Sequence, residues 1–407
     1  MNAAAANERA IAGVLACKPR LVAIKAALDV VPGMRRELLL HAGPPATWDA
    51  LSPVLQAGVA GAADVEGLSR DEVVLGAAQD FASMAGGAGS ITASTPVVCV
   101  EDEASGRRAF HFLMEGFGRT LILGMTGEDV SERLRWLREE AAPALDAAVQ
   151  ALGGIDCDAI MIEALRRGDE LHNRNAAATS MLAERLAPGL ALAGVAAAVQ
   201  ERLFAFLGGN PQFFVAVSMA ASKLMLDAGH GVEGSTLVTA MGANGRDCGI
   251  KVSGLGDRWF VAPAEVPEGV PLDGFTDDDA GPGCGDSLLV ECAGFGASVL
   301  PAGPALWPLL GVDEARARSI VEAARELALA EHPRYRVPAL GDAGAPVGVD
   351  LQRVLETGTR PVIDIVMLHR EPGRGMIGFG LTSPPRACFE QAAHAFTVES
   401  NRPERSL

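Results

Sequence analysis

A polar run in an alanine-rich part of the sequence is the first place where chemistry could occur. The run is GDELHNRN at 168–175, and three alanines follow it. Gly168 is a natural helix stop, and Asn173 could cap the helix that follows. Free N–H groups at a helix start attract anions, and Arg174 beside them can bind a phosphate or carboxylate through two hydrogen bonds. The structural alternative is an ordinary i, i+4 ion pair between Glu170 and Arg174.

His172, Asn173 and Asn175 are the candidate reactive residues of this run. His172 could move a proton, and the two amides could donate hydrogen bonds to an oxyanion that develops during a reaction. His172, Asn175 and Thr179 would share one helical face if the helix begins early enough. An asparagine at a helix start is often only a cap. Polar groups are costly to bury without cause, however, which favours a functional site.

A second candidate is the run GGNPQ at 208–212. Asn210 is suited to a helix N-cap and Pro211 to the first helical position, so a helix is predicted from Pro211 to about Gly229. The two glycines before it could hold an oxyanion on free backbone N–H groups, with Asn210 as a binding residue. A well-made turn between two helices explains the run equally well.

A third candidate surrounds Asn244-Gly245, a pair typical of a tight β-hairpin turn. Arg246 and Lys251 could bind an anion that Asn244 also contacts, and Asp247 could accept or orient a proton. A hairpin turn with an exposed ion pair explains the same residues. The two interpretations remain open at this point.

Metal and cofactor motifs are absent from the sequence. The acidic stretch 277–286 lacks the spacing of a calcium loop, although Asp286 and Glu291 could orient a substrate amine. The seven cysteines form no CxxC pair, which argues against both a disulfide framework and a zinc site. There is also no Walker A, GxSxG or HExxH motif. We therefore expect no metal and no cofactor.

The pattern around these runs predicts an α+β protein with two mixed α/β domains and a central helical domain. Residues 1–125 form the N-terminal α/β domain, residues 126–230 the helical domain and residues 231–407 the C-terminal α/β domain. The predicted strands include 37–43, 97–102, 108–116, 120–125 and 361–368.

Charge and hydropathy limit the possible partners. The formal net charge is −17, and no local block of lysine and arginine offsets it, so nucleic acid and anionic membrane surfaces are excluded as partners. No apolar stretch reaches membrane length, and the N-terminal residues do not have the pattern of a signal peptide. We expect a soluble, cytoplasmic protein.

Four long segments resemble one family of bacterial proteins. The resemblance to the YlbE/AllG family is carried by GDELHNRNAAATSML, GNPQFFVAVSMAASKLMLDA, GSTLVTAMGANGRDCGIKVSGLGDRWFVAPA and GDSLLVECAGFG. It implies a three-part α+β protein with a central helical domain. It also implies action with two co-encoded partner proteins as an oxamate carbamoyltransferase, which interconverts oxalurate plus phosphate with oxamate plus carbamoyl phosphate in allantoin (purine nitrogen) degradation. The resemblance assigns no catalytic residues.

Carbamoyl transfer agrees with the chemistry of the candidate residues. Small anionic substrates such as carbamoyl phosphate and oxamate need anion donors, for which Arg174, Arg246 and Lys251 are suited. Positioning of the two reactants could supply much of the acceleration without a covalent nucleophile. The sequence therefore predicts that His172, Arg174 and Arg246 converge on one cleft.

Two alternatives remain open from the sequence. The chain could be a non-catalytic structural or regulatory subunit of such a complex, with the active site mostly on a partner chain. It could also take part in carbamoyl transfer on another ureido substrate, because members of one family can differ in substrate.

Overall fold

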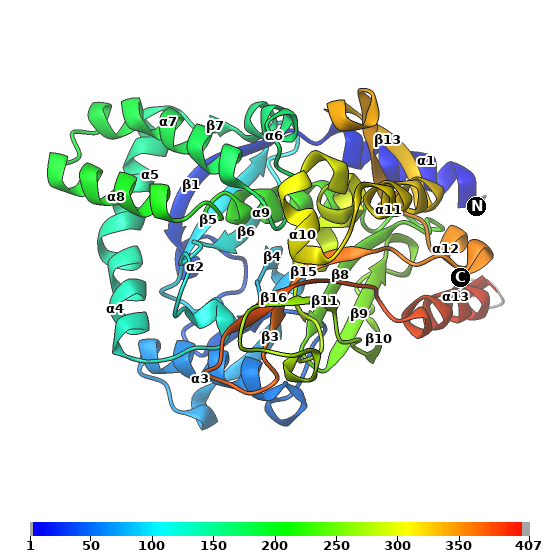
Figure 1. Cartoon of the computed structure of the whole chain (residues 1–407), viewed down its shortest axis with the longest axis horizontal. Helices are drawn as coiled ribbons and strands as arrows, with labels where there is room; N and C mark the ends of the chain where they lie inside the picture. The colour runs from blue at the N-terminus through cyan, green and yellow to red at the C-terminus, as the bar shows by residue number, and fades with distance from the viewer. Residues whose placement is uncertain (1–2, 401–407) are drawn as a thin grey trace, which may run out of the picture.

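The computed structural model describes residues 3–400 and shows small β-sheets with helices packed between and around them (Figure 1). This is the mixed α+β fold that the sequence predicted. Residues 1–2 and 401–407, at the ends of the first and third predicted domains, lie outside the described residues. No described helix has both the length and the apolar character that crossing a membrane requires.

The first sheet has the strand order β4-β6-β5-β1-β7. The predicted hairpin is present, because β5 pairs antiparallel with β6. β7 comes from the region predicted to be purely helical and pairs with β1. The strands are β1 (Pro19–Ala26), β4 (Ser83–Met84), β5 (Pro96–Asp102), β6 (Arg108–Phe112) and β7 (Ile155–Asp156).

The C-terminal half contains a second sheet of order β10-β9-β8-β12 and a third of order β11-β16-β15. The predicted turn at Asn244-Gly245 joins β8 to β9. The strands are β8 (Val238–Asn244), β9 (Asp247–Val252), β10 (Phe260–Pro263), β11 (Glu268–Pro271), β12 (Cys284–Gly285), β15 (Ile363–Leu368) and β16 (Met376–Thr382). Two further pairs are β2 (Leu38–His41) with β3 (Val74–Ala77) and β13 (Ala328–Val337) with β14 (Ala343–Val349).

Helix α9 (Val215–Asp227) lies at the centre of the molecule (Figure 1). It contacts β5 and β6 on one side and the 3-10 helix η8 (Ser287–Ala293) on another. Its sequence, VAVSMAASKLMLD, is small or apolar apart from the ion pair between Lys223 and Asp227, as expected for a helix that is buried on most sides. The helix therefore links the N-terminal sheet to the C-terminal half.

The other helices cover the sheets. In Figure 1, α5, α7 and α8 form a layer next to β1, and both described chain ends lie on the opposite side of the molecule. The helices are α1 (Ala3–Ala16), α2 (Ala27–Val30), α3 (Pro53–Glu66), α4 (Glu128–Trp136), α5 (Ala142–Ala151), α6 (Cys157–Arg166), α7 (Ala176–Leu192), α8 (Ala197–Gly209), α10 (Trp307–Leu310), α11 (Glu314–Leu327), α12 (Leu351–Thr357) and α13 (Arg386–Ser400).

The structure corrects the prediction for residues 120–125. The segment is not a strand: it contains the 3-10 helix η4 (Leu121–Leu123). The carboxylate of buried Glu115 accepts hydrogen bonds from the backbone N–H groups of Leu121 and Ile122, at 2.9 and 3.0 Å. An acidic side chain that binds the start of the segment folds it into a turn.

The predicted start of the central helix is also wrong. α9 begins at Val215, not at Pro211, and Asn210 does not cap it. The Asn210 amide instead donates to the backbone oxygen of Met114, 3.0 Å away. The hydroxyl of Thr179, on α7, accepts from the N–H of Phe214 at the helix start. Thr179, from another helix, thus accepts the hydrogen bond at the helix start that Asn210 was expected to accept.

Residues from all three predicted domains share the largest hydrophobic core. The cluster includes Val98 from the first, Leu145 and Phe214 from the second, and Val252 and Phe295 from the third. The division at residues 125 and 230 therefore remains a prediction. Residues from all three regions also lie next to Val215 and Met219 of α9.

Candidate functional site

A cavity of about 110 Å³ lies where these three regions meet. Its lining is mostly apolar and includes the backbone of Gly86 and Gly87 from the N-terminal region. The side chains of His172, Asn173 and Gln212 line it from the helical region. A mostly apolar cavity with a few convergent polar groups is typical of a binding site for a small molecule.

The loop that carries His172 and Asn173 is folded around the carboxylate of Glu170. That carboxylate is completely buried and accepts from the backbone N–H groups of His172 and Arg174, at 2.5 and 2.6 Å. Leu171 has a φ of +70°, which is uncommon for a residue with a side chain, and the hydroxyl of Ser218 donates to its carbonyl oxygen. Glu170 is therefore bound to the backbone and does not form the expected ion pair with Arg174.

Asp169, not Asn173, caps the following helix. Its Oδ2 atom accepts from the N–H of Ala178 at 2.8 Å. The guanidinium of Arg174 folds back over the same turn, where Nε donates to the carbonyl of Gly168 and lies 3.5 Å from Asp169 Oδ1. Because α7 begins only at Ala176, the loop residues do not share a helical face.

His172 is held between two buried carboxylates. Its Nδ1 atom lies 2.9 Å from Glu291 Oε1 and 3.0 Å from Asp364 Oδ1. The three side chains are exposed by only 4, 1 and 0 per cent. With Nδ1 committed to the carboxylates, Nε2 is the ring nitrogen that remains for a ligand in the cavity.

The charges of this cluster are strongly coupled. Burial alone would lower the pKa of His172, but the charges of Glu291 and Asp364 raise it well above its ordinary value. Burial raises the pKa of Glu291 to about 8, against the opposing effect of His172. Burial would also raise the pKa of Asp364, yet His172 holds it below its ordinary value. This distribution favours a proton on Glu291 and a negative charge on Asp364.

The amides around His172 form a short chain. Asn175 donates to the carbonyl of His172 at 2.8 Å and to Gln212 Oε1 at 3.1 Å. Gln212 in turn donates to the carbonyl of Asn173. The Asn173 side chain is buried beside the Asp364 carboxylate, and its hydrogen bond contributes to the lowered pKa of that group. Asn175 thus supports the loop, whereas Asn173 lines the cavity next to Asp364.

The hairpin residues lie elsewhere. Asn244 Oδ1 accepts from the N–H groups of Arg246 and Asp247, at 3.1 and 2.8 Å, and so closes the β8–β9 turn. The Arg246 guanidinium donates to the carbonyl of Asp49. None of the three hairpin residues lines the cavity of His172.

Lys251 lines a different, polar pocket. Its Nζ atom lies 2.5 Å from Asp80 and 3.7 Å from Asp257, and Lys223 and His230 line the same pocket. The two lysines there are paired with carboxylates of the chain itself, whereas Arg107, which also lines the pocket, donates to the backbone oxygen of Asp227. An anion would have to displace those carboxylates to bind.

The structure therefore brings together only part of the predicted site. His172 and Asn173 line one cavity and Asn175 supports them, but the expected convergence of His172, Arg174 and Arg246 is not seen. The predicted anion-binding roles of Arg174, Arg246 and Lys251 remain untested. Three residues that the sequence analysis did not select contribute to the site, namely Gln212, Asp364 and Glu170.

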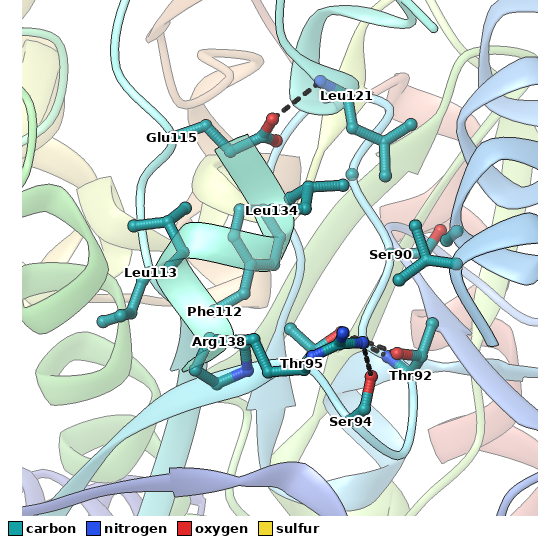
Figure 2. Close-up of a pocket in the computed structure, with 15 residues that line it drawn as sticks. Ser90, Thr92, Ser94, Thr95, Phe112, Leu113, Glu115, Leu121, Leu134 and Arg138 are labelled. Carbon is teal, nitrogen blue, oxygen red and sulfur yellow. Dashed lines mark hydrogen bonds between the residues drawn. The ribbon is translucent and has the colours of Figure 1, made fainter. Parts of the chain in front are cut away.

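A second cavity, of about 50 Å³, is lined by hydroxyl groups, Glu115 and Arg138 (Figure 2). The Glu115 carboxylate is bound to Leu121, as Figure 2 shows, and Arg138 contacts Ser94 and forms an ion pair with Glu139. Its charged groups are thus already bound to the chain. The cavity of His172 remains the stronger candidate, because it places an imidazole and two side-chain amides together.

Comparison with known proteins identifies the family of the chain. A sequence model described as oxamate carbamoyltransferase subunit AllG matches residues 73–287. The oxamate carbamoyltransferase subunit AllG of Escherichia coli K12 is 35% identical over 97% of this chain and 97% of its own length. The chain belongs to the AllG family.

Two further relatives of this AllG-family chain have no assigned activity. An uncharacterized protein, YahG, of Escherichia coli K12 is 35% identical over 96% of this chain and 85% of its own length. The crystal structure of a conserved protein of unknown function from Enterococcus faecalis V583 is 36% identical, with a TM-score of 0.94 over 97% of both chains. The two chains thus share one fold over almost their whole length.

Proposed function

We propose that this chain is a subunit of an oxamate carbamoyltransferase complex and contributes side chains to its active site. Membership of the AllG family over almost the whole chain supports the first part. The observation that carries the second part is the cavity in which His172, Asn173 and Gln212 meet the Gly86–Gly87 backbone. We place the complex in the cytoplasm and in allantoin degradation.

The proposed reaction converts oxalurate and phosphate into oxamate and carbamoyl phosphate. An oxygen of hydrogenphosphate attacks the carbamoyl carbon of oxalurate, and the bond from that carbon to the oxamate nitrogen breaks. The proton of hydrogenphosphate passes to the departing nitrogen, so atoms and charges balance. Between the attack and the bond cleavage, negative charge develops on the carbamoyl oxygen. In the proposed mechanism the His172 Nε2–H and the Asn173 amide donate hydrogen bonds to that oxygen.

The cavity also explains why partner subunits would be required. Both reactants are anions, yet among the lining residues, all within 3–400, none is a lysine or an arginine. Phe117 lies at this cavity and is about half exposed. We therefore propose that the two co-encoded partners cover this face and supply the cations that bind phosphate and the oxamate carboxylate.

A phosphorolysis assay tests the proposal. The purified chain, alone and with both co-encoded proteins, would receive oxalurate and phosphate, and oxamate and carbamoyl phosphate would be measured. We expect turnover only in the assembled complex. If the complex uses a different ureido acid, the substrate assignment is wrong. If complexes turn over oxalurate equally well after Asn173→Ala and Gln212→Ala, the chain is a structural or regulatory subunit.

A further inference from the structure

We infer that His172, Glu291 and Asp364 form a binding site for one divalent transition-metal ion. The inference goes beyond the proposed reaction and does not depend on it. One imidazole nitrogen and two carboxylate oxygens lie within 4.8 Å of one another, and the two distances from the nitrogen are 2.9 and 3.0 Å. Ligands about 2.1 Å from a tetrahedral or octahedral ion lie roughly 3.0–3.4 Å apart, so little movement is needed to bind one.

The buried oxygens provide a second observation. Glu291 Oε2 and Asp364 Oδ2 are buried and accept no hydrogen bond from a backbone N–H group among the described residues, and the two carboxyl groups interact with each other. In the metal-free chain the protons on His172 and Glu291 compensate the two carboxyl groups, and a divalent ion would replace those protons. A divalent ion bound by two carboxylates and a neutral imidazole gives a site with no net charge.

Gly296 keeps space free beside the two carboxylates. A Cβ atom at this position would lie 2.3 Å from Glu291 Oε1 and 2.9 Å from Asp364 Oδ1, and the backbone φ of +59° also disfavours a side chain. Only glycine, therefore, allows the chain to pass this close to the proposed ligands.

Rigid elements hold the three ligands. Glu291 lies on η8, which packs against α9, and Asp364 lies on β15. His172 is fixed by the hydrogen bonds of Glu170 to its loop. Binding of the metal at Nδ1 would leave the proton on Nε2, the ring nitrogen that does not contact the two carboxylates.

The ligand types narrow the choice of metal. Imidazole suits zinc, iron and nickel, whereas carboxylates suit magnesium and manganese, so a mixed set favours Zn²⁺ or Mn²⁺. No sequence motif indicates this metal site, because His172 and Glu291 are 119 residues apart. Motif spacing detects only ligands that share one local segment.

Metal content of the full-length chain is the direct test. The chain would be stripped with a chelator, dialysed against Mn²⁺ or Zn²⁺, and analysed by inductively coupled plasma mass spectrometry. We expect one ion per chain. Glu291→Gln and Asp364→Asn, which keep the volume of each side chain, should weaken binding by more than the roughly 10–100-fold that loss of a supporting residue costs.

Glu115→Gln is the matched control, because this buried carboxylate binds two backbone N–H groups outside the cluster. It should bind metal like the wild type. Should the ligand variants fail to fold, wild-type thermal unfolding decides instead: Mn²⁺ or Zn²⁺ should raise the Tm in a concentration-dependent manner. Folded wild-type chain that takes up neither ion, or variants that bind as well as wild type, would overturn the inference. Neither metal uptake nor its failure tests whether the complex transfers a carbamoyl group.

Discussion

Replacing His172 by asparagine should lower the kcat of the assembled complex by about 10²–10³-fold, the usual cost of removing one donor to a developing oxyanion. Asparagine can still reach Glu291 and Asp364 from the position of Nδ1, but it has no group at the position of Nε2. Glutamine places an amide nearer to Nε2 and should retain more activity. Initial rates of carbamoyl phosphate formation at saturating oxalurate would measure the difference.

His332→Asn provides a matched control for this variant. His332 is also fully buried, and its Nδ1 atom accepts from the N–H groups of Arg334 and Tyr335, which an asparagine oxygen can replace. It lies outside the cavity. The complex assembled with the His332→Asn chain should keep the wild-type kcat. Equal rates for His172→Asn and the wild type would show that the histidine does not touch the reacting atoms.

Glu170→Ala should both destabilise the chain and impair the reaction. It leaves the buried N–H groups of His172 and Arg174 without an acceptor, at a cost of about 1–3 kcal/mol each. The free energy of unfolding should therefore fall by about 2–6 kcal/mol, as measured by urea denaturation. Glu170→Gln keeps one acceptor oxygen and should lose about half as much.

The effect on rate separates loop positioning from general stability. Asp102→Ala removes another buried carboxylate that binds a turn, through the N–H groups of Lys18 and Ser105, but far from the cavity in the β5–β6 hairpin. Asp102→Ala should lower the free energy of unfolding and leave the kcat of the folded complex unchanged. Glu170→Ala should lower both the free energy of unfolding and the kcat. If its kcat remains at the wild-type value, the conformation of the 168–175 loop is irrelevant to catalysis.

Local sequence signals predicted many of the helices and strands, and they predicted the His172–Asn173 part of the candidate site. The GDELHNRN run was recognised because polar residues are costly in an alanine-rich setting, and His172 and Asn173 do line the cavity. The Asn244-Gly245 turn was recognised because few residues tolerate its backbone angles. Signals of this kind depend on residues that are neighbours in the sequence, so they can be detected without a structure.

The missed residues depend on contacts between distant segments. Asp364 lies inside PVIDIVML, a predicted apolar strand, where a single acidic residue was the only available signal. Gln212 was read as part of a turn. The side chain of Arg174 was expected to bind a substrate, but it contacts the carbonyl of Gly168 and the carboxylate of Asp169, six and five residues away. Whether a charged group pairs within the chain or binds a ligand is decided by tertiary packing, which no spacing rule describes.

Filling the cavity is the most direct test of the claim that the reaction occurs there. Leu123→Trp would place an indole in the cavity of His172, whereas Leu134→Trp would place the same group in the second cavity (Figure 2). Both leucines are partly buried, so the two variants perturb the fold to a similar extent. The assembled complexes would be compared in the oxalurate phosphorolysis assay. We predict that Leu123→Trp abolishes turnover while Leu134→Trp retains it. Full turnover with Leu123→Trp, in a complex that still assembles, would contradict the proposed location of the active site.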